Sequence, residues 1–205
     1  MKYKYNKMVI GVDQSYNNCG ISIFCDGKKK YIGSIKFNPN QSNSEKRYIL
    51  SNRLEHFLES KIGVCKEVII IVERIRQFSG GFVSMDYIKS TGALIATIVD
   101  IGYKYGIKVY SVDTRAWKTQ IVGTSKPQNN KYGINPKKWP TILFIKKKGW
   151  LSSVIEELPE KSKKQKGVLC INGKKYIVND DACDSVCIAL YGFLPKSTQN
   201  LKEEH

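Results

Sequence analysis

The sequence predicts an α/β fold: a mixed five-stranded sheet flanked by helices, with an extra β-hairpin before the last helix. Three observations support this prediction. Polar turns break the alternating apolar N-terminal stretch, an apolar β-branched run occupies residues 68–72, and Asn172-Gly173 separates two later apolar runs. We expect residues 1–195 to form a single domain and 196–205 a polar C-terminal tail, because 205 residues suit one well-filled core.

The first three strands are predicted to form an antiparallel meander. Residues 8–13 are apolar up to Asp13, and after a polar turn the alternation resumes over residues 19–24. The Asp26-Gly27 turn then leads into a third alternating run at 30–37. Asp13 stands at the mouth of the first hairpin, where a charge must be paired, hydrated or bound to a metal.

Helices and strands alternate in the rest of the chain. The run at 68–72 is apolar on both faces, which is typical of a central parallel strand buried under helices. Apolar spacing predicts helices from residue 44 or 45 to 61, over 84–102, over 137–148 and from Asp180 or Asp181 to 192, and a further strand over 107–112. Pro136 suits the first turn of the third helix. The helix at 84–102 is apolar on more than one face, which suits a dimer interface or deeper burial.

Basic residues far outnumber acidic ones. The chain has 34 Lys and Arg against 18 Asp and Glu, a net charge of +16, and residues 104–175 alone contain 17 basic and 4 acidic residues. Nucleic acid is therefore the expected partner, although an AT-rich genome would produce the same lysine usage. No signal peptide core or run of about 20 apolar residues is present. We expect a cytoplasmic protein, in the bacterial cytosol or a phage-infected host cell, with no membrane partner.

Four carboxylates are candidates for a metal site. Glu73 ends the buried run as Asp13 ends the first strand, and Asp181 and Asp184 are three residues apart in the first turn of the last helix, so they point the same way. Helix capping explains the last pair equally well, and Asp180 competes with Asp181 for the inward position. Four clustered carboxylates would require divalent cations, and oxygen ligands suit Mg²⁺ or Mn²⁺. The set predicts phosphodiester hydrolysis with two ions per active site.

Four segments in this order resemble the RuvC-type Holliday junction resolvases of the RNase H-like superfamily, closest to small phage-borne variants. They are IGVDQSYNNCGISIF, IIIVERI, VDTRAWKTQIVG followed by a basic helix, and DDACDSVCIAL, and the resemblance spans about residues 8–193. It implies an RNase H-like fold and Asp13, Glu73, Asp181 and Asp184 as catalytic, metal-binding residues. It also implies a homodimer that resolves four-way DNA junctions by paired symmetric nicks, a two-fold enzyme on a two-fold substrate.

The candidate DNA-binding residues are basic or aromatic and follow the strand ends. They are Arg74, Arg76, Phe78, Phe82, Arg115, Lys118, Lys126, Lys137 and Lys138. The resembled family carries an aromatic residue shortly after the catalytic glutamate, whereas the third residue here is Arg76. Phe78 and Phe82, in a loop with two glycines, are the candidates for insertion at an opened junction. A solvated helix face accounts for many of the lysines equally well.

Three other functions are compatible with parts of this sequence pattern. The same metal site could cut the RNA strand of an RNA–DNA hybrid or other branched nucleic acids. A non-catalytic basic DNA-binding module would use its carboxylates only for caps and ion pairs. A sugar-kinase or actin-like ATPase also begins with a hairpin bearing an Asp, but no glycine-rich adenosine-binding stretch is evident in the sequence.

Overall fold

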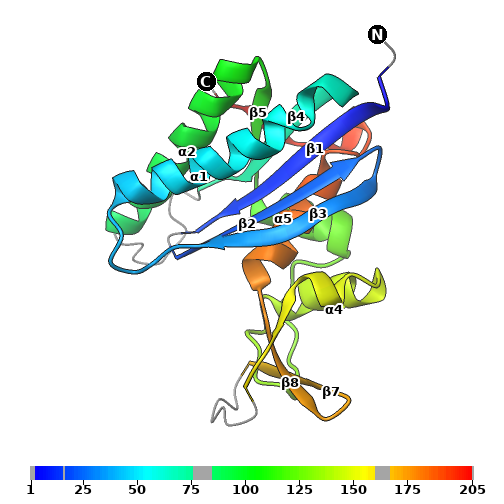
Figure 1. Cartoon of the computed structure of the whole chain (residues 1–205). Coiled ribbons are helices and arrows are strands. Elements are labelled where there is room, and N and C mark those ends of the chain that lie inside the picture. The colour runs from blue at the N-terminus through cyan, green and yellow to red at the C-terminus, as the bar shows by residue number, and fades with distance from the viewer. Residues whose placement is uncertain (1–2, 16, 76–84, 160–166, 205) are drawn as a thin grey trace.

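The protein is built on a six-stranded mixed sheet in the order β3-β2-β1-β4-β5-β9 (Figure 1). The computed structural model describes residues 3–15, 17–75, 85–159 and 167–204. The strands are β1 (Tyr5–Gln14), β2 (Asn18–Cys25), β3 (Lys28–Lys36), β4 (Cys65–Glu73), β5 (Lys108–Val112) and β9 (Leu201–Glu203). The predicted meander and the central parallel strand are confirmed: β1, β2 and β3 pair antiparallel, and β4 lies parallel between β1 and β5.

Helices cover both faces of this sheet (Figure 1). Helices α1 (Asn43–Glu59) and α2 (Met85–Tyr105) pack on one face, and α5 (Asp180–Tyr191) and α4 (Trp139–Lys147) lie on the other. The short turns are α3 (Thr114–Trp117), η1 (Ile62–Val64), η2 (Lys118–Val122), η3 (Leu151–Ser153) and η4 (Lys196–Thr198). None of the helices in the described residues is long and apolar enough to cross a membrane.

Strand β1 separates two hydrophobic cores by its alternation. Met8, Ile10 and Val12 pack in the core under α1 and α2, whereas Val9 packs in the core under α5. On the α5 side the helix comes close to the sheet, because a Cβ at Gly11 would lie 2.2 Å from the Ser185 carbonyl oxygen. The chemistry at the start of α5 is therefore held directly against the sheet.

A small second sheet extends away from the main one, in the order β6-β8-β7 (Figure 1). Its strands are β6 (Ile155–Glu157), β7 (Val168–Ile171) and β8 (Lys174–Val178). The predicted hairpin is confirmed, and both turn residues, Asn172 (φ 51°) and Gly173 (φ 78°), have the positive φ that a two-residue hairpin loop requires.

The C-terminal residues differ from the prediction of a five-stranded sheet followed by a polar tail. Residues 201–203 add β9 to the open edge of β5, pairing Leu201 with Val112. The sequence pattern misses this strand because three residues are too few to show alternation, and backbone hydrogen bonds hold it whatever the side chains.

The third long helix also begins later than expected. Helix α4 starts at Trp139 and carries Pro140, not Pro136, in its first turn. Asn135 accounts for the difference: its side chain accepts a hydrogen bond from the Lys137 backbone and its carbonyl oxygen accepts one from Lys138, which forms a separate turn ahead of the helix.

Candidate active site

Two of the predicted carboxylates lie at the ends of neighbouring parallel strands. Asp13 is near the end of β1 and Glu73 is the last residue of β4, so both reach the same edge of the sheet. Gln14 joins the two strand ends, because its side-chain amide donates to the Glu73 carbonyl and accepts from the Glu73 N–H. A pocket of about 230 Å³ opens here, with Asp13 and Glu73 on one wall and Tyr87 and Thr91 of α2 on the other.

The other two predicted carboxylates come from the start of α5. Asn179 is the N-cap and accepts a hydrogen bond from the Ala182 N–H at 3.0 Å, so no aspartate caps this helix. Asp184 is buried, with 2% of its surface exposed. The Asp181 carboxylate accepts a 2.8 Å hydrogen bond from the Asn18 amide of β2, whereas the Asp180 side chain is 46% exposed. Asp181 is therefore the inward-facing member of the pair.

The raised pKa values of Asp13, Glu73 and Asp181 indicate that the carboxylates lie close to one another. Burial, followed by the charges of Glu73 and Asp184, raises the pKa of Asp13 well above its ordinary value, and Asp181 contributes in the same direction. Burial and then Asp184 raise the pKa of Glu73, against the hydrogen bond from Thr114. Burial is also the main cause that raises the pKa of Asp181 to about 6. All four carboxylates thus belong to one electrostatic cluster.

Lys138 supplies a cation to this cluster. Its Nζ lies 2.6 Å from Asp184 Oδ2 and 3.6 Å from Asp180 Oδ2. Burial lowers the pKa of Lys138, but the charges of Asp184 and Asp13 outweigh burial and raise the pKa above its ordinary value. Lys138 therefore stays charged and partly neutralises the buried acids.

Three positioning residues were not predicted from the sequence: Gln14, Asn18 and Thr114. Thr114 is the first residue of α3, just past the end of β5, and its hydroxyl donates to Glu73 Oε1 at 2.5 Å. Asn18 ties Asp181 to the helix cap, since its amide also donates to Asn179 Oδ1 at 3.0 Å. The one signal in the sequence is that each lies within five residues of a predicted strand end next to an acidic residue.

The donor set suits a divalent cation in kind. Asp184 Oδ1 is buried and has no hydrogen-bond partner among the described residues, so this oxygen is available to a cation. Within the described ranges, no three acidic, histidine or cysteine side chains lie close enough together to hold one ion, and Lys138 occupies the position beside Asp184. Cation binding would thus require the carboxylates and Lys138 to rearrange.

The predicted DNA-binding residues that the structure describes fall into three groups. Arg74 and Arg115 line a cavity of about 710 Å³ beside the site, and the Arg74 guanidinium donates to Ser111 Oγ at 3.2 Å. Lys118 is 9% exposed, and its ammonium donates to the carbonyl oxygen of Lys137, the residue before Lys138. The remaining lysines of the prediction, Lys126 and Lys137, are exposed between η2 and α4. Their contacts with DNA stay predictions, and Arg76, Phe78 and Phe82 lie outside the described residues.

The fold and the placement of the site can be compared with known proteins. No family model matches the chain, and no curated protein matches it by sequence. Among solved structures, Thermus thermophilus RuvC in complex with a Holliday junction substrate is 15% identical with a TM-score of 0.61, and the match covers 96% of this chain and 99% of that one. A second structure of Thermus thermophilus RuvC is 15% identical with a TM-score of 0.54, covering 89% and 91%. The chain therefore has the RuvC fold.

Proposed function

We propose that this protein is a Mg²⁺-dependent endonuclease that cuts branched DNA, with the four-way junction as its substrate and Mn²⁺ able to replace Mg²⁺. The observation that supports it most is the cluster of Asp13, Glu73, Asp181 and Asp184 at one edge of the sheet, on a chain of net charge +16. The fold neighbour that was solved with a Holliday junction indicates the class of substrate. In this proposal the basic surface holds the DNA backbone over an acidic pocket.

Asp13, Glu73, Asp181 and Asp184 are the residues of this chain that would hold the divalent cations. When bound, such ions stabilise negative charge on the attacking and leaving oxygens of a phosphodiester. Thr114 and Gln14 orient Glu73, and Asn18 orients Asp181, so that these oxygens keep their direction. In the absence of a cation, Lys138 pairs with Asp184, and a cation held by Asp184 would compete with this ammonium group.

A homodimer would cut the two strands of a junction symmetrically. Along α2, Ile88, Gly92, Ile95 and Val99 recur at spacings of four, three and four residues, and each is only partly buried. Three of them line the 710 Å³ cavity. We propose that this stripe packs against its copy in a second chain. Light scattering should give the mass of a dimer on the junction, and a monomer there would contradict paired nicking.

The catalytic proposal is tested with isosteric substitutions. Asp13→Asn and Glu73→Gln should each abolish Mg²⁺-dependent cutting of a labelled four-way junction while leaving its binding in EDTA within about twofold, because they remove a ligand charge and not a phosphate contact. Asp100→Asn makes the same change at an exposed position and should cut normally. Retained cutting by either site variant would refute the proposal. Equal amounts of junction, flap and RNA–DNA hybrid in one reaction identify the preferred substrate.

A further inference from the structure

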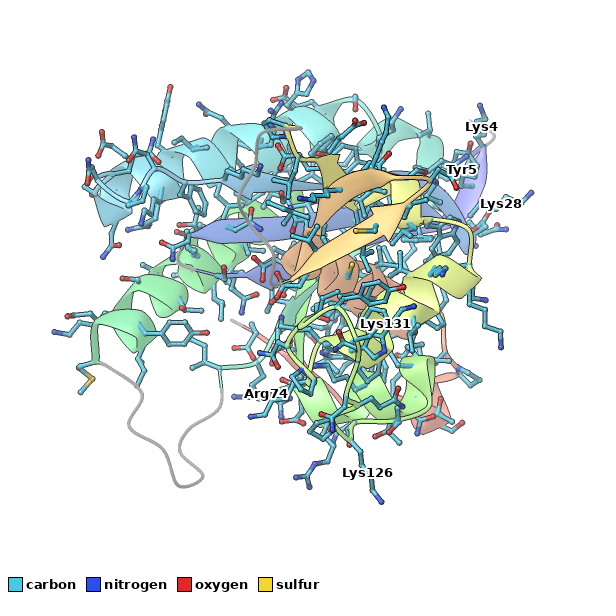
Figure 2. The ribbon with its side chains drawn as sticks, turned by 90° about the horizontal axis from the view of Figure 1, so that it is seen from below. Lys4, Tyr5, Lys28, Arg74, Lys126 and Lys131 are labelled. Carbon is cyan, nitrogen blue, oxygen red and sulfur yellow. The ribbon has the colours of Figure 1, made fainter. Side chains whose placement is uncertain are left out.

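A second cluster of basic residues lies far from the acidic pocket. It consists of Lys4, just before β1, and of Lys28, Lys29 and Lys30 at the start of β3, and we call it the lysine corner. Figure 2 shows Lys4, Tyr5 and Lys28 together at one side of the molecule, apart from Arg74 and Lys126. All four lysines are exposed. None of them is among the DNA-binding residues predicted from the sequence.

The lysine corner is an ordered surface. Lys30 Nζ lies 4.6 Å and Lys4 Nζ 5.6 Å from the centroid of the Tyr5 ring, so one aromatic ring holds two ammonium groups at the surface. Lys29 Nζ donates to Ser153 Oγ at 3.2 Å, which ties the start of β3, next to the turn from β2, to η3. Each of these three ammonium groups is therefore held by a neutral side chain.

The lysine corner keeps a net positive charge, because its four lysines face one nearby acid that pairs with none of them. Asp26 is the acidic residue of the same turn, but its carboxylate accepts the backbone N–H groups of Asn6 and Lys7 at 3.1 and 2.8 Å. Within the described part of the chain, no carboxylate lies within 4.0 Å of any of the four ammonium groups. By contrast, Lys36 at the other end of β3 pairs with Glu156. The lysine corner thus offers unpaired positive charge to an external anion.

The sheet links the lysine corner to the acidic pocket. β1 begins at Tyr5 and reaches Asp13 eight residues later, which at about 3.3 Å per residue is roughly 26 Å. The edge strand β3 covers the same span, from Lys28 opposite Cys25 to Lys36 opposite Asn18, the residue that holds Asp181. A rod-shaped polyanion that lies on the pocket and follows this edge would meet both clusters.

We propose that the lysine corner binds the sugar-phosphate backbone of one duplex arm of the same DNA whose branch point lies at the acidic pocket. The inference rests on the proposed function. At about 3.4 Å per phosphate along a strand, the contact falls roughly eight base pairs from the scissile phosphate. Exposed ammonium groups contact phosphates and do not read base edges, so the contact is independent of sequence and depends on salt. It makes arm length a determinant of affinity.

The test compares two junctions of the same core sequence. One has hairpin-closed arms of about 6 base pairs, too short to reach the lysine corner, and the other has arms of about 20 base pairs. We expect Lys28→Glu/Lys29→Glu to weaken binding of the long-armed junction at least tenfold and to lower its salt slope by about 2, while short-arm binding changes less than twofold. Arg53→Glu/Lys196→Glu makes the same charge change at two other exposed positions and should affect both junctions equally and weakly.

The outcomes separate this inference from the catalytic proposal. Equal affinity of the charge-reversed and wild-type proteins for long arms, or an equal loss for both junctions, would overturn the role of the lysine corner. Binding is measured in EDTA and does not require cutting. A wild-type protein that fails to cut would therefore refute the proposed nuclease activity, but the binding comparison could still be interpreted. If the Glu variant unfolds, Lys28→Ala/Lys29→Ala gives the same comparison, with about a threefold loss expected for long arms only.

Discussion

The charged residues at the two ends of β1 differ in their burial and in their pairing. At the end that carries Asp13, burial and neighbouring acids raise the pKa values of Asp13 and Glu73, and Lys138 Nζ lies 2.6 Å from the buried Asp184. At the end that begins with Tyr5, the lysines of the lysine corner are exposed, and the acid of the turn, Asp26, binds backbone N–H groups instead. The like charges clustered at the buried end lower the free energy of unfolding, whereas the exposed lysines change it little.

This difference predicts where substitutions act. Charges that are buried and paired are screened little by salt, so their removal should change the free energy of unfolding and the affinity for cations. Exposed, unpaired charges should change only the binding of DNA and its dependence on salt. Three further substitutions at the buried end test this division.

Lys138→Met should have the largest effect on stability. It leaves Asp184 buried beside Asp13 without a cation, and breaking such a pair should lower the free energy of unfolding by about 4 kcal/mol at pH 7 in EDTA. Urea denaturation measures the loss. Lys137→Met changes the exposed neighbour and should have little effect. If Lys138→Met/Asp184→Asn is as unstable as Lys138→Met alone, the unpaired charge of Asp184 is not the cause of the loss.

Asp181→Asn should change how stability depends on pH. Because burial raises the pKa of Asp181 to about 6, the folded chain keeps a proton that the unfolded chain has lost above about pH 4. Stability without metal therefore falls as pH rises from about 4 to 6. The variant should lose the part of this decline that Asp181 causes and gain about 2 kcal/mol at pH 7, allowing for partial solvent screening. Asp13 and Glu73, whose pKa values are also raised, should keep the rest of the decline. Asp100→Asn should keep the wild-type profile, and a variant with the wild-type profile would show that Asp181 is not strained.

Thr114→Val should have a smaller effect, confined to cation affinity. It removes the hydroxyl that donates to Glu73 Oε1 while keeping the shape of the side chain. Loss of such an orienting hydrogen bond should weaken Mn²⁺ binding about tenfold, measured by calorimetry without DNA. Thr114→Ser keeps the donor and should restore the affinity. Unchanged affinity in Thr114→Val would mean that Gln14 alone positions Glu73.

The fold could be predicted from the sequence wherever apolar periodicity was long enough to read. The meander, the central run at 68–72 and the Asn172-Gly173 turn all carry their own local signal, and all are confirmed. β9 could not be predicted because its three residues are recruited by the open edge of β5. The start of α4 was misplaced because both Pro136 and Pro140 fit a first helical turn, and Asn135 decides between them through hydrogen bonds.

The convergence of Asp13 and Glu73 could be predicted from the sequence, whereas the side chains that pair with the acids could not. Asp13 and Glu73 end strands that the sequence identifies, so their convergence follows from parallel pairing. The ion pair between Lys138 and Asp184 joins the residue just before α4 to a residue of α5, and no periodicity in the sequence encodes a separation of 46 positions. Asn18 and Thr114 are common polar residues, whose roles appear only when β2 meets α5 and α3 meets β4.

The close approach of α5 to the sheet determines which positions a mutational screen of this protein should identify as essential. A Cβ at Gly20 would lie 2.0 Å from the Asp181 carbonyl oxygen, and Gly11 meets Ser185 in the same way. A methyl group at either position would push the acidic helix outward and move its aspartates with it. A selection for inactive clones should therefore recover these two glycines alongside the carboxylates, although neither has a side chain to offer DNA or an ion.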